Sequence, residues 1–327
     1  MKVVVAGLLV AIATMAMLPT RAVDPASHAA PVTRYADAVA RIERQQSVDA
    51  RVAAVGGGTL FMTHGRRTAR VVVLFHGFTD SPRQFVHVAA RLFETGDNVY
   101  VPRLPHHAER NGTIGSLARL TAEELASFAD SSIDIAGGLG DSVIAAGVSA
   151  GGTIAAWIAE RRSDVQRVVV IAPVLEIGRV PSFLETPLMN VGLRLPNVNR
   201  SEGRDPARPD RDPGVSTRAV AQLLRLGHAV RELAQKTPPR AREIIFVVNA
   251  NDHTVKTAPV LELARAWSAS HTPVTVYQFP RKLNLPHDIA EAAHENADTT
   301  VVYPVLRALI NGQRPLPVLA ARRLWPR

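Results

Sequence analysis

The chain has 327 residues, of which 46% are hydrophobic and 20% charged, with a formal net charge of +9 and no cysteine. This composition excludes a disordered chain and a protein with many membrane spans, and the missing cysteine excludes disulfides, thiolate metal sites, a cysteine nucleophile and a lipid anchor on cysteine. The positive charge comes mainly from arginines scattered among acidic residues, as in residues 200–212, which indicates solvated surface rather than a nucleic-acid-binding protein.

The N-terminal segment has the pattern of an export signal. Lys2 is followed by an uncharged, mostly apolar run over residues 3–18, and then by small residues that suit cleavage after Ala22 or Ala29. The run is shorter than the roughly 20 residues that a membrane-spanning helix needs. We therefore expect a signal peptide over residues 1–22 and export to the periplasm or the medium. The alternative is an uncleaved N-terminus that anchors the protein to a membrane.

From about residue 51 onward, strand-like and helix-like segments alternate. The expected strands cover residues 51–55, 60–63, 71–75, 98–102, 142–147, 167–172, 244–248 and 274–279. The expected helices cover residues 82–93, 121–136, 151–161, 217–236, 258–267 and 297–309. The first two strands flank Gly56, Gly57 and Gly58 and should form a hairpin. The alternation predicts an α/β fold with a mostly parallel central sheet and helices on both faces.

One stretch interrupts this alternation. Residues 174–214 have no clean periodicity and are rich in Pro, Gly, Asn and charged residues. In α/β proteins ligands bind at the carboxyl ends of the strands, and long ordered loops are usually functional. We expect a lid here; the alternative is a solvent-exposed loop followed by an ordinary crossover helix. The expected units are an N-terminal linker or helix at residues 30–50, a core at 51–173 and 241–312, a lid at 174–240 after the sixth strand, and a basic tail at 313–327.

The most specific motif is the sequence GVSAG at residues 147–151, which lies between an expected strand and an expected helix. A serine at such a sharp turn needs small neighbours, and Gly147 and Gly151 leave room for the backbone to pass. The helix that follows presents the N–H of Ala150 to an oxyanion formed at Ser149. The motif predicts Ser149 as a nucleophile in acyl transfer.

A second motif begins with His76, Gly77 and Phe78, directly after the third expected strand. A backbone N–H of this loop, that of Phe78, would be the second oxyanion donor. We expect His76 to hydrogen-bond the loop rather than to transfer protons. Asp80 should cap the next helix together with Ser81.

The acid and the base are expected at the ends of later strands. Asp252 lies just past the strand at 244–248, and His287 follows the strand at 274–279. The chain order Ser149, Asp252, His287 is the order found in hydrolases with this kind of serine turn. Other acids and histidines lie at less suitable positions in the chain: His253, His271, His294, Asp288 and Asp298.

Together these motifs resemble the α/β-hydrolase superfamily, in particular serine esterases of the carboxylesterase and monoacylglycerol-lipase type, over roughly residues 50–312. The resemblance implies the α/β-hydrolase fold and a mechanism that needs no metal or organic cofactor. The implied site residues are Ser149 as nucleophile, His287 as general base, Asp252 as the acid that orients it, and Phe78 and Ala150 as oxyanion donors.

The sequence departs from these relatives at His106 and His107, where they often carry glycines around a single histidine. Two adjacent side chains diverge, and no third metal ligand is evident. We therefore expect a surface or packing role here rather than a metal site.

The expected activity is hydrolysis of carboxylic esters through an acyl-enzyme intermediate. The same triad also serves amidases, peptidases and acyltransferases, and a catalytically silent binding protein is a further alternative. The expected partner is a small-molecule ester. We also expect a weak attraction of the basic tail to membrane surfaces. Apolar residues of the expected lid either favour apolar or acylglycerol-like esters or simply pack the lid onto the core: Phe183, Leu184, Leu188, Met189, Val191, Leu193 and Leu195.

Overall fold

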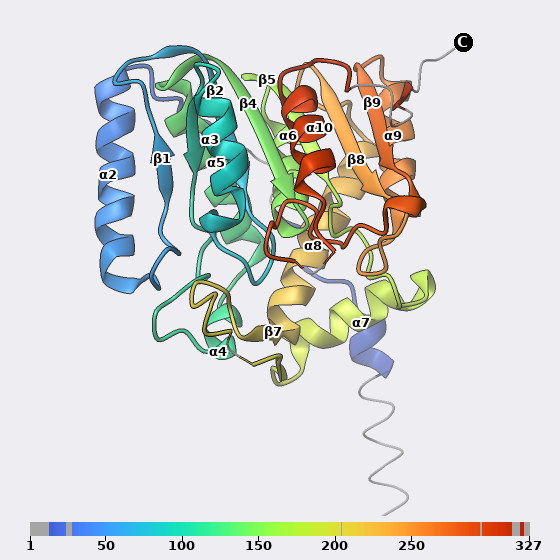
Figure 1. Cartoon of the computed structure of the whole chain (residues 1–327). Coiled ribbons are helices and arrows are strands. Elements are labelled where there is room, and N and C mark those ends of the chain that lie inside the picture. The colour runs from blue at the N-terminus through green and yellow to red at the C-terminus, as the bar shows by residue number, and fades with distance from the viewer. Residues whose placement is uncertain (1–12, 24–27, 204, 295, 316–320, 324–327) are drawn as a thin grey trace, which may run out of the picture.

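The protein has an α/β fold built on one large sheet (Figure 1). The computed structural model describes residues 13–23, 28–203, 205–294, 296–315 and 321–323. Within these residues the sheet has eight strands, in the order β1-β3-β2-β4-β5-β8-β9-β10. The two edge strands pair antiparallel to their neighbours, and the strands between them are parallel. In chain order the strands are β1 (Leu60–Met62), β2 (Thr68–Phe75), β3 (Asn98–Val101), β4 (Gly140–Val148), β5 (Val165–Ile171), β8 (Ile244–Asn249), β9 (Val274–Phe279) and β10 (Ala321–Arg323).

Helices cover both faces of this sheet, so the predicted architecture is confirmed. α3 (Val86–Phe93) and α10 (Thr299–Ile310) pack together on the face turned to the viewer in Figure 1. α2 (Tyr35–Val52) lies beside β1 at the edge of the sheet, where it packs against α5. The remaining long helices of the core are α5 (Ala122–Gly137), α6 (Ala150–Arg161) and α9 (Thr257–Ala269). Shorter helical turns are α4 (Ile114–Leu117), η1 (Pro82–Phe85) and η2 (Arg281–Leu283).

The prediction of a hairpin at the start of the core is wrong. Arg51 and Val52 are the last residues of α2, because the buried positions of this segment, such as Ile42, recur at helical spacing. The chain then runs along another loop, where the N–H of Ala54 donates to the carbonyl of Ala108 (2.7 Å). The strand that precedes the insertion is therefore the fifth of the chain rather than the sixth.

The insertion, residues 174–240, follows β5 and lies at the carboxyl ends of the strands, below the sheet in Figure 1. It contains α7 (Ser182–Arg194), a hairpin of β6 (Asn199–Ser201) and β7 (Gly214–Ser216), and α8 (Thr217–Ala234). The two helices approach closely, since a Cβ added to Gly192 would lie 3.0 Å from the Cβ of Ala221. The insertion thus faces the loops at which the predicted site residues lie.

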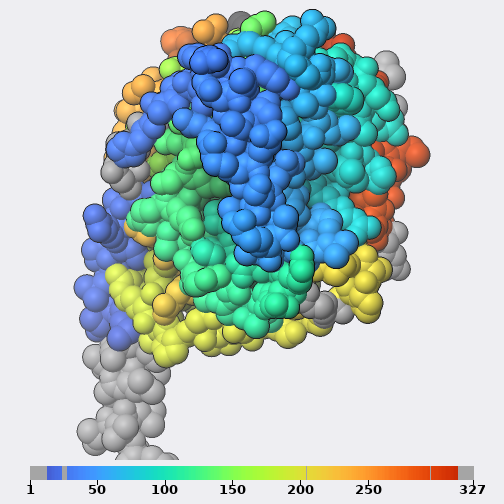
Figure 2. Space-filling model, turned by 90° about the vertical axis from the view of Figure 1, so that its left-hand side faces the viewer, coloured from blue at the N-terminus to red at the C-terminus, as the bar shows by residue number. Residues whose placement is uncertain are grey.

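The N-terminal segment at residues 13–23 lies against the insertion (Figures 1 and 2). Asn190 donates from Nδ2 to the carbonyl of Ala16 (2.8 Å), and Arg194 donates to the carbonyl of Pro19 (2.8 Å). From α8, Arg225 donates from Nε to the carbonyl of Arg21 (2.9 Å). The first part of the predicted signal peptide lies outside the described residues, and its second part contacts α7 and α8.

In the part of the chain that the structure describes, we find no helix with the length and the hydrophobicity needed to cross a membrane.

Candidate active site

Ser149 occupies the sharp turn between β4 and α6. Its backbone has φ 56° and ψ −114°, a strained conformation for a residue with a side chain. Glycine is required on both sides, because a Cβ on Gly147 would collide with the carbonyl of Gly151, and a Cβ on Gly151 would collide with the carbonyl of Phe75. The N–H of Gly151 donates to the carbonyl of His76 (3.1 Å), which holds the serine turn against the loop after β2.

The structure brings Ser149, Asp252 and His287 into one hydrogen-bonded chain. His287 Nε2 lies 2.9 Å from Ser149 Oγ, and His287 Nδ1 lies 2.7 Å from Asp252 Oδ2. A carboxylate only accepts hydrogen bonds, so Nδ1 carries the ring proton and Nε2 is left to accept the serine hydroxyl. The other carboxylate oxygen of Asp252 accepts the backbone N–H groups of Thr254 (2.8 Å) and Val255 (3.1 Å).

Asn249 positions the loop that carries His287, and the sequence analysis missed it. It is the last residue of β8 and is only 1% exposed. Its Nδ2 donates to the carbonyls of Leu285 and Pro286, both at 2.9 Å, and its Oδ1 accepts the N–H of Asn251 (3.0 Å). A single amide at the end of an otherwise apolar strand was the signal that could have identified it.

The loop after β2 places backbone N–H groups beside the serine. A Cβ built on Gly77 would lie 3.7 Å from the Cβ of Ser149, so the two segments are in contact. The N–H of Gly77 donates to Gln84 Oε1 (2.8 Å). Within the described residues, the N–H groups of Phe78 and Ala150 have no protein acceptor. They are therefore available to an oxygen of a bound substrate.

His76 is buried and hydrogen-bonded within this loop. Its Nδ1 lies 2.9 Å from the carbonyl of Gly77, and its Nε2 accepts the N–H of Leu104 (3.0 Å). Burial, and after it the neighbouring His107, holds the pKa of His76 well below its usual value. The imidazole is therefore neutral, and both of its nitrogens are engaged by the backbone.

His106 and His107 have separate environments. His106 Nε2 lies 3.1 Å from Glu124 Oε2, whereas His107 Nδ1 lies 2.7 Å from the carbonyl of Pro105. The ring of His107 packs edge-on against Phe78, with centroids 5.4 Å apart, and burial lowers its pKa to about 4. Among the described residues, no three histidine or carboxylate side chains gather in a way that could hold a metal ion.

The roles expected for Asp80 and for residues 200–212 are wrong in part. Ser81 alone caps η1, accepting the N–H of Arg83 (3.2 Å), while Asp80 is fully buried and pairs with Arg208 (2.8 Å). Arg208 itself is buried, so this part of the charged stretch is not solvated surface. A charge-balanced stretch looks the same in sequence whether its partners are water or buried carboxylates.

Comparison with known proteins adds a sequence relative. A thermostable monoacylglycerol lipase of Bacillus sp. (strain H-257) is 25% identical over 191 residues, which are 56% of this chain and 71% of that lipase.

Solved structures share the fold. A metagenome-derived lipolytic enzyme superposes with a TM-score of 0.58 at 17% identity, covering 80% of this chain and 100% of that chain. The monoacylglycerol lipase of Paleococcus ferrophilus superposes with a TM-score of 0.59 at 18% identity, covering 78% of this chain and 98% of that chain. The family model described as serine aminopeptidase, S33, matches residues 66–279, more than half of the chain. The protein is therefore an α/β-hydrolase and belongs to the serine aminopeptidase S33 family, with distant lipase and esterase relatives.

Proposed function

We propose that the protein is a serine esterase that cleaves carboxylic esters through an acyl-enzyme intermediate. The hydrogen-bonded chain from Ser149 through His287 to Asp252 is the observation that carries this proposal. It lies beside the backbone N–H groups of Phe78 and Ala150, which suit an oxyanion. The lipase and esterase names of the relatives favour ester substrates.

Attack begins at the serine hydroxyl. His287 Nε2, 2.9 Å away, removes the proton as Ser149 Oγ bonds to the ester carbonyl carbon. Asp252 keeps its hydrogen bond to Nδ1 and stabilises the imidazolium without taking the proton. The negative carbonyl oxygen accepts hydrogen bonds from the N–H groups of Phe78 and Ala150, each worth about 3 kcal/mol in the transition state.

Collapse of this intermediate expels the alcohol, which takes the proton from His287. The acyl group is then bonded to Ser149 Oγ. Water attacks the acyl carbon while His287 Nε2 removes its proton. The bond between the acyl carbon and Ser149 Oγ then breaks, Oγ takes the proton back from His287, and the carboxylic acid leaves. Each proton step therefore uses the same nitrogen, Nε2. The other ring proton stays on Nδ1 throughout, hydrogen-bonded to Asp252.

A fluorophosphonate probe tests this function. The wild-type protein should react at Ser149, and Ser149→Ala, the matched control, should not. Mass spectrometry of the labelled peptide identifies the residue. A folded wild type that neither reacts with the probe nor hydrolyses any of a panel of p-nitrophenyl esters would contradict the proposal.

An apolar cavity of about 360 Å³ within the insertion suits an acyl chain. Side chains of α7 and α8 line it, among them Leu188, Met189 and Val220. Ile177, which also lines the cavity, pairs with Val255 in the loop of Asp252. The cavity therefore adjoins the segment that carries the acid of the triad, and we propose apolar or acylglycerol-like esters as substrates.

Val220→Phe should shift the preference toward short acyl chains, because the larger side chain fills part of this cavity. The ratio of kcat/KM for an octanoate to that for an acetate p-nitrophenyl ester should fall by at least about tenfold, since pocket contacts with even one methylene are worth roughly 10- to 200-fold. Val86→Phe, at an exposed position of α3 outside the insertion, is the control. An unchanged chain-length profile in Val220→Phe would show that acyl chains bind elsewhere.

The family description also makes an aminopeptidase a candidate. A substrate with a free α-amino group needs a carboxylate in the substrate site. Glu185, the acidic residue among those lining the cavity, already has partners within the protein. Its Oε1 accepts the N–H of Ile177 (2.8 Å) and lies 4.0 Å from Lys256 Nζ. These features favour esters, and matched ester and amide substrates separate the two activities by their ratio of kcat/KM.

We also propose that the chain is exported, on the pattern of residues 3–18. Fractionation of an expressing bacterial host should then yield a protein that begins at Val23 or at Ala30, as mass spectrometry of the intact protein would reveal. A protein that keeps residues 1–22 and sediments with membranes would instead support an N-terminal anchor.

A further inference from the structure

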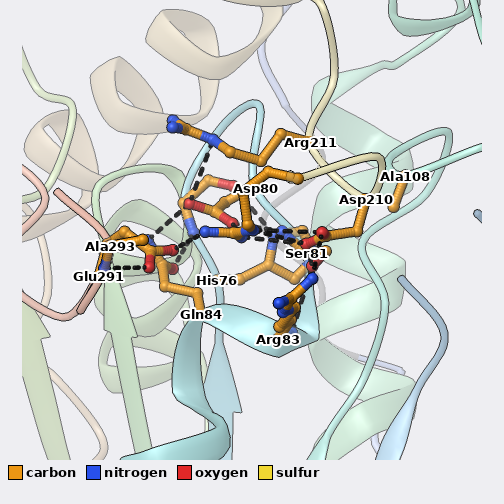
Figure 3. Close-up of polar contacts among 12 residues, drawn as sticks. His76, Asp80, Ser81, Arg83, Gln84, Ala108, Asp210, Arg211, Glu291 and Ala293 are labelled. Carbon is orange, nitrogen blue, oxygen red and sulfur yellow. Dashed lines mark hydrogen bonds and ion pairs between the residues drawn. The ribbon is translucent and has the colours of Figure 1, made fainter. Parts of the chain in front are cut away.

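A buried ionic cluster joins three segments that are distant in the sequence (Figure 3). Its central cation is Arg208 of the insertion, which is 6% exposed. Nη2 of Arg208 donates to Asp80 (2.8 Å) in the loop after β2 and to Asp210 (3.0 Å) in the insertion. Nη1 donates to Glu291, which lies four residues after His287. One guanidinium thus contacts both the loop of the oxyanion donors and the segment of the base.

The insertion also holds the backbone of the oxyanion loop. The N–H of Asp212 donates to the carbonyl of Thr79 (2.9 Å), the residue next to Phe78. Ser81 Oγ donates to Asp210 Oδ2 (2.6 Å). The position of the Phe78 amide therefore depends on hydrogen bonds between this loop and the insertion.

Gln84 links this loop to the segment of the base. Its Oε1 accepts the N–H of Gly77 (2.8 Å), and its Nε2 donates to Asp80 Oδ2 (3.3 Å) and to Asp288 Oδ1. Asp288 is the residue directly after His287. In Figure 3, Gln84 lies between Asp80 and Glu291.

Carboxyl groups outnumber arginines in the cluster: Asp80, Asp210, Asp288 and Glu291 face Arg83, Arg208 and Arg211. Burial raises the pKa of Asp80, the carboxylates of Asp288 and Glu291 raise it further, and Arg208 and Arg211 oppose this rise. Burial would also raise the pKa of Asp210, but hydrogen bonds from Arg208 and Ser81 lower it below its usual value. Without Arg208, the buried carboxylates repel one another and lose their shared donor.

We propose that Arg208 is a positioning residue for ester hydrolysis, which fixes the oxyanion loop and the His287 segment relative to each other. It does so without a contact to Ser149, Asp252 or His287 among its hydrogen bonds. The inference rests on the proposed esterase function. A planar guanidinium suits this role because its fork donates to several carboxylates at once, which the point charge of a lysine does not.

The test compares Arg208→Gln, Arg208→Lys and a matched control. Concentrations of active sites are titrated with the fluorophosphonate probe, and kcat and KM are measured with a p-nitrophenyl ester. Arg208→Gln should lower kcat per titrated site by about 10- to 100-fold, since a displacement of about 1 Å at the reacting groups costs roughly that much. KM should stay within about twofold. Arg208→Lys keeps the charge and so protects folding, and its kcat should fall by at least about fivefold.

The control is Arg225→Gln in α8 of the same insertion. Arg225 is also buried, at 9% exposed. It pairs with Glu123 of α5 and donates to the carbonyl of Arg21, away from both loops. Arg225→Gln should lower the melting temperature and leave kcat per titrated site unchanged. The affinity of a trifluoromethyl ketone, which mimics the tetrahedral intermediate, should fall with kcat/KM in the Arg208 variants only.

Two outcomes would overturn the inference separately from the function. Wild-type kcat per titrated site in Arg208→Lys, with only the melting temperature changed, shows that Arg208 acts through stability alone. Equal losses of kcat in the Arg208 and Arg225 variants would show that destabilising the insertion anywhere lowers turnover. A wild type without labelling or turnover would instead remove the esterase function itself, and the role of Arg208 with it.

Discussion

Ser149→Ala is expected to lower kcat for a p-nitrophenyl ester by at least about 10⁴-fold, because loss of the nucleophile of a Ser-His-Asp triad costs roughly 10⁴- to 10⁶-fold. The hydroxyl is the group that lies 2.9 Å from His287 Nε2, and alanine has no atom that His287 could activate there. Steady-state kinetics at saturating ester, at a pH where the wild type is fully active, measure this loss.

The fold should persist in this variant. Ser149 is 8% exposed, and its backbone strain is set by the glycines around it rather than by its hydroxyl. Alanine should therefore leave the melting temperature within a few degrees, since a change of 1 kcal/mol shifts it by about 2–4 °C in a chain of this size. More than about 1% of the wild-type kcat in a homogeneous preparation would show that another residue is the nucleophile.

Asp252→Asn should lower kcat by about 10⁴-fold with little change in structure, through the wrong histidine tautomer. Asp252 Oδ1 accepts two backbone N–H groups, from Thr254 and Val255, so the amide oxygen of asparagine must take that place. The NH₂ group then points at His287 Nδ1 and forces the ring proton onto Nε2. In this tautomer Nε2 donates a hydrogen bond and no longer removes the proton of Ser149.

Asp298→Asn is the matched control for this substitution. Asp298 caps α10 by accepting the N–H of Val301 (3.2 Å), and asparagine is an equally good cap. Its kcat should equal that of the wild type. If Asp252→Asn retained more than about a tenth of wild-type kcat, the hydrogen bond between Asp252 and His287 would not set the tautomer.

The arrangement of strands was predictable from local patterns. The β-branched run of β2 and the turn around Ser149 each depend on residues that are neighbours in the chain, so their geometry follows from nearby sterics. Parallel strands bring their carboxyl ends to one edge, and this is why His287 can hydrogen-bond both Ser149 and Asp252, which follow other strands of the sheet.

The start of the core was not predictable in the same way. Residues 51–55 are as compatible with a short strand as with the end of a helix, and burial of α2 residues such as Ile42 decides for the helix. Asn249 is similar, because the carbonyls of Leu285 and Pro286 that it binds are more than 30 residues away. Contacts of this range are formed by packing and leave no periodic pattern.

The sequence alone determined that the chain is a cysteine-free α/β protein with Ser149 at a strand-to-helix turn and with an acid and a histidine at later strand ends. Only the tertiary structure decided that Arg208 lies buried among Asp80, Asp210 and Glu291 rather than in water. The physical reason is that a charged side chain becomes buried only when hydrogen-bonding partners in the protein replace the water around it. For Arg208 two of those partners are more than 80 residues away in the chain, and the fold alone brings them together.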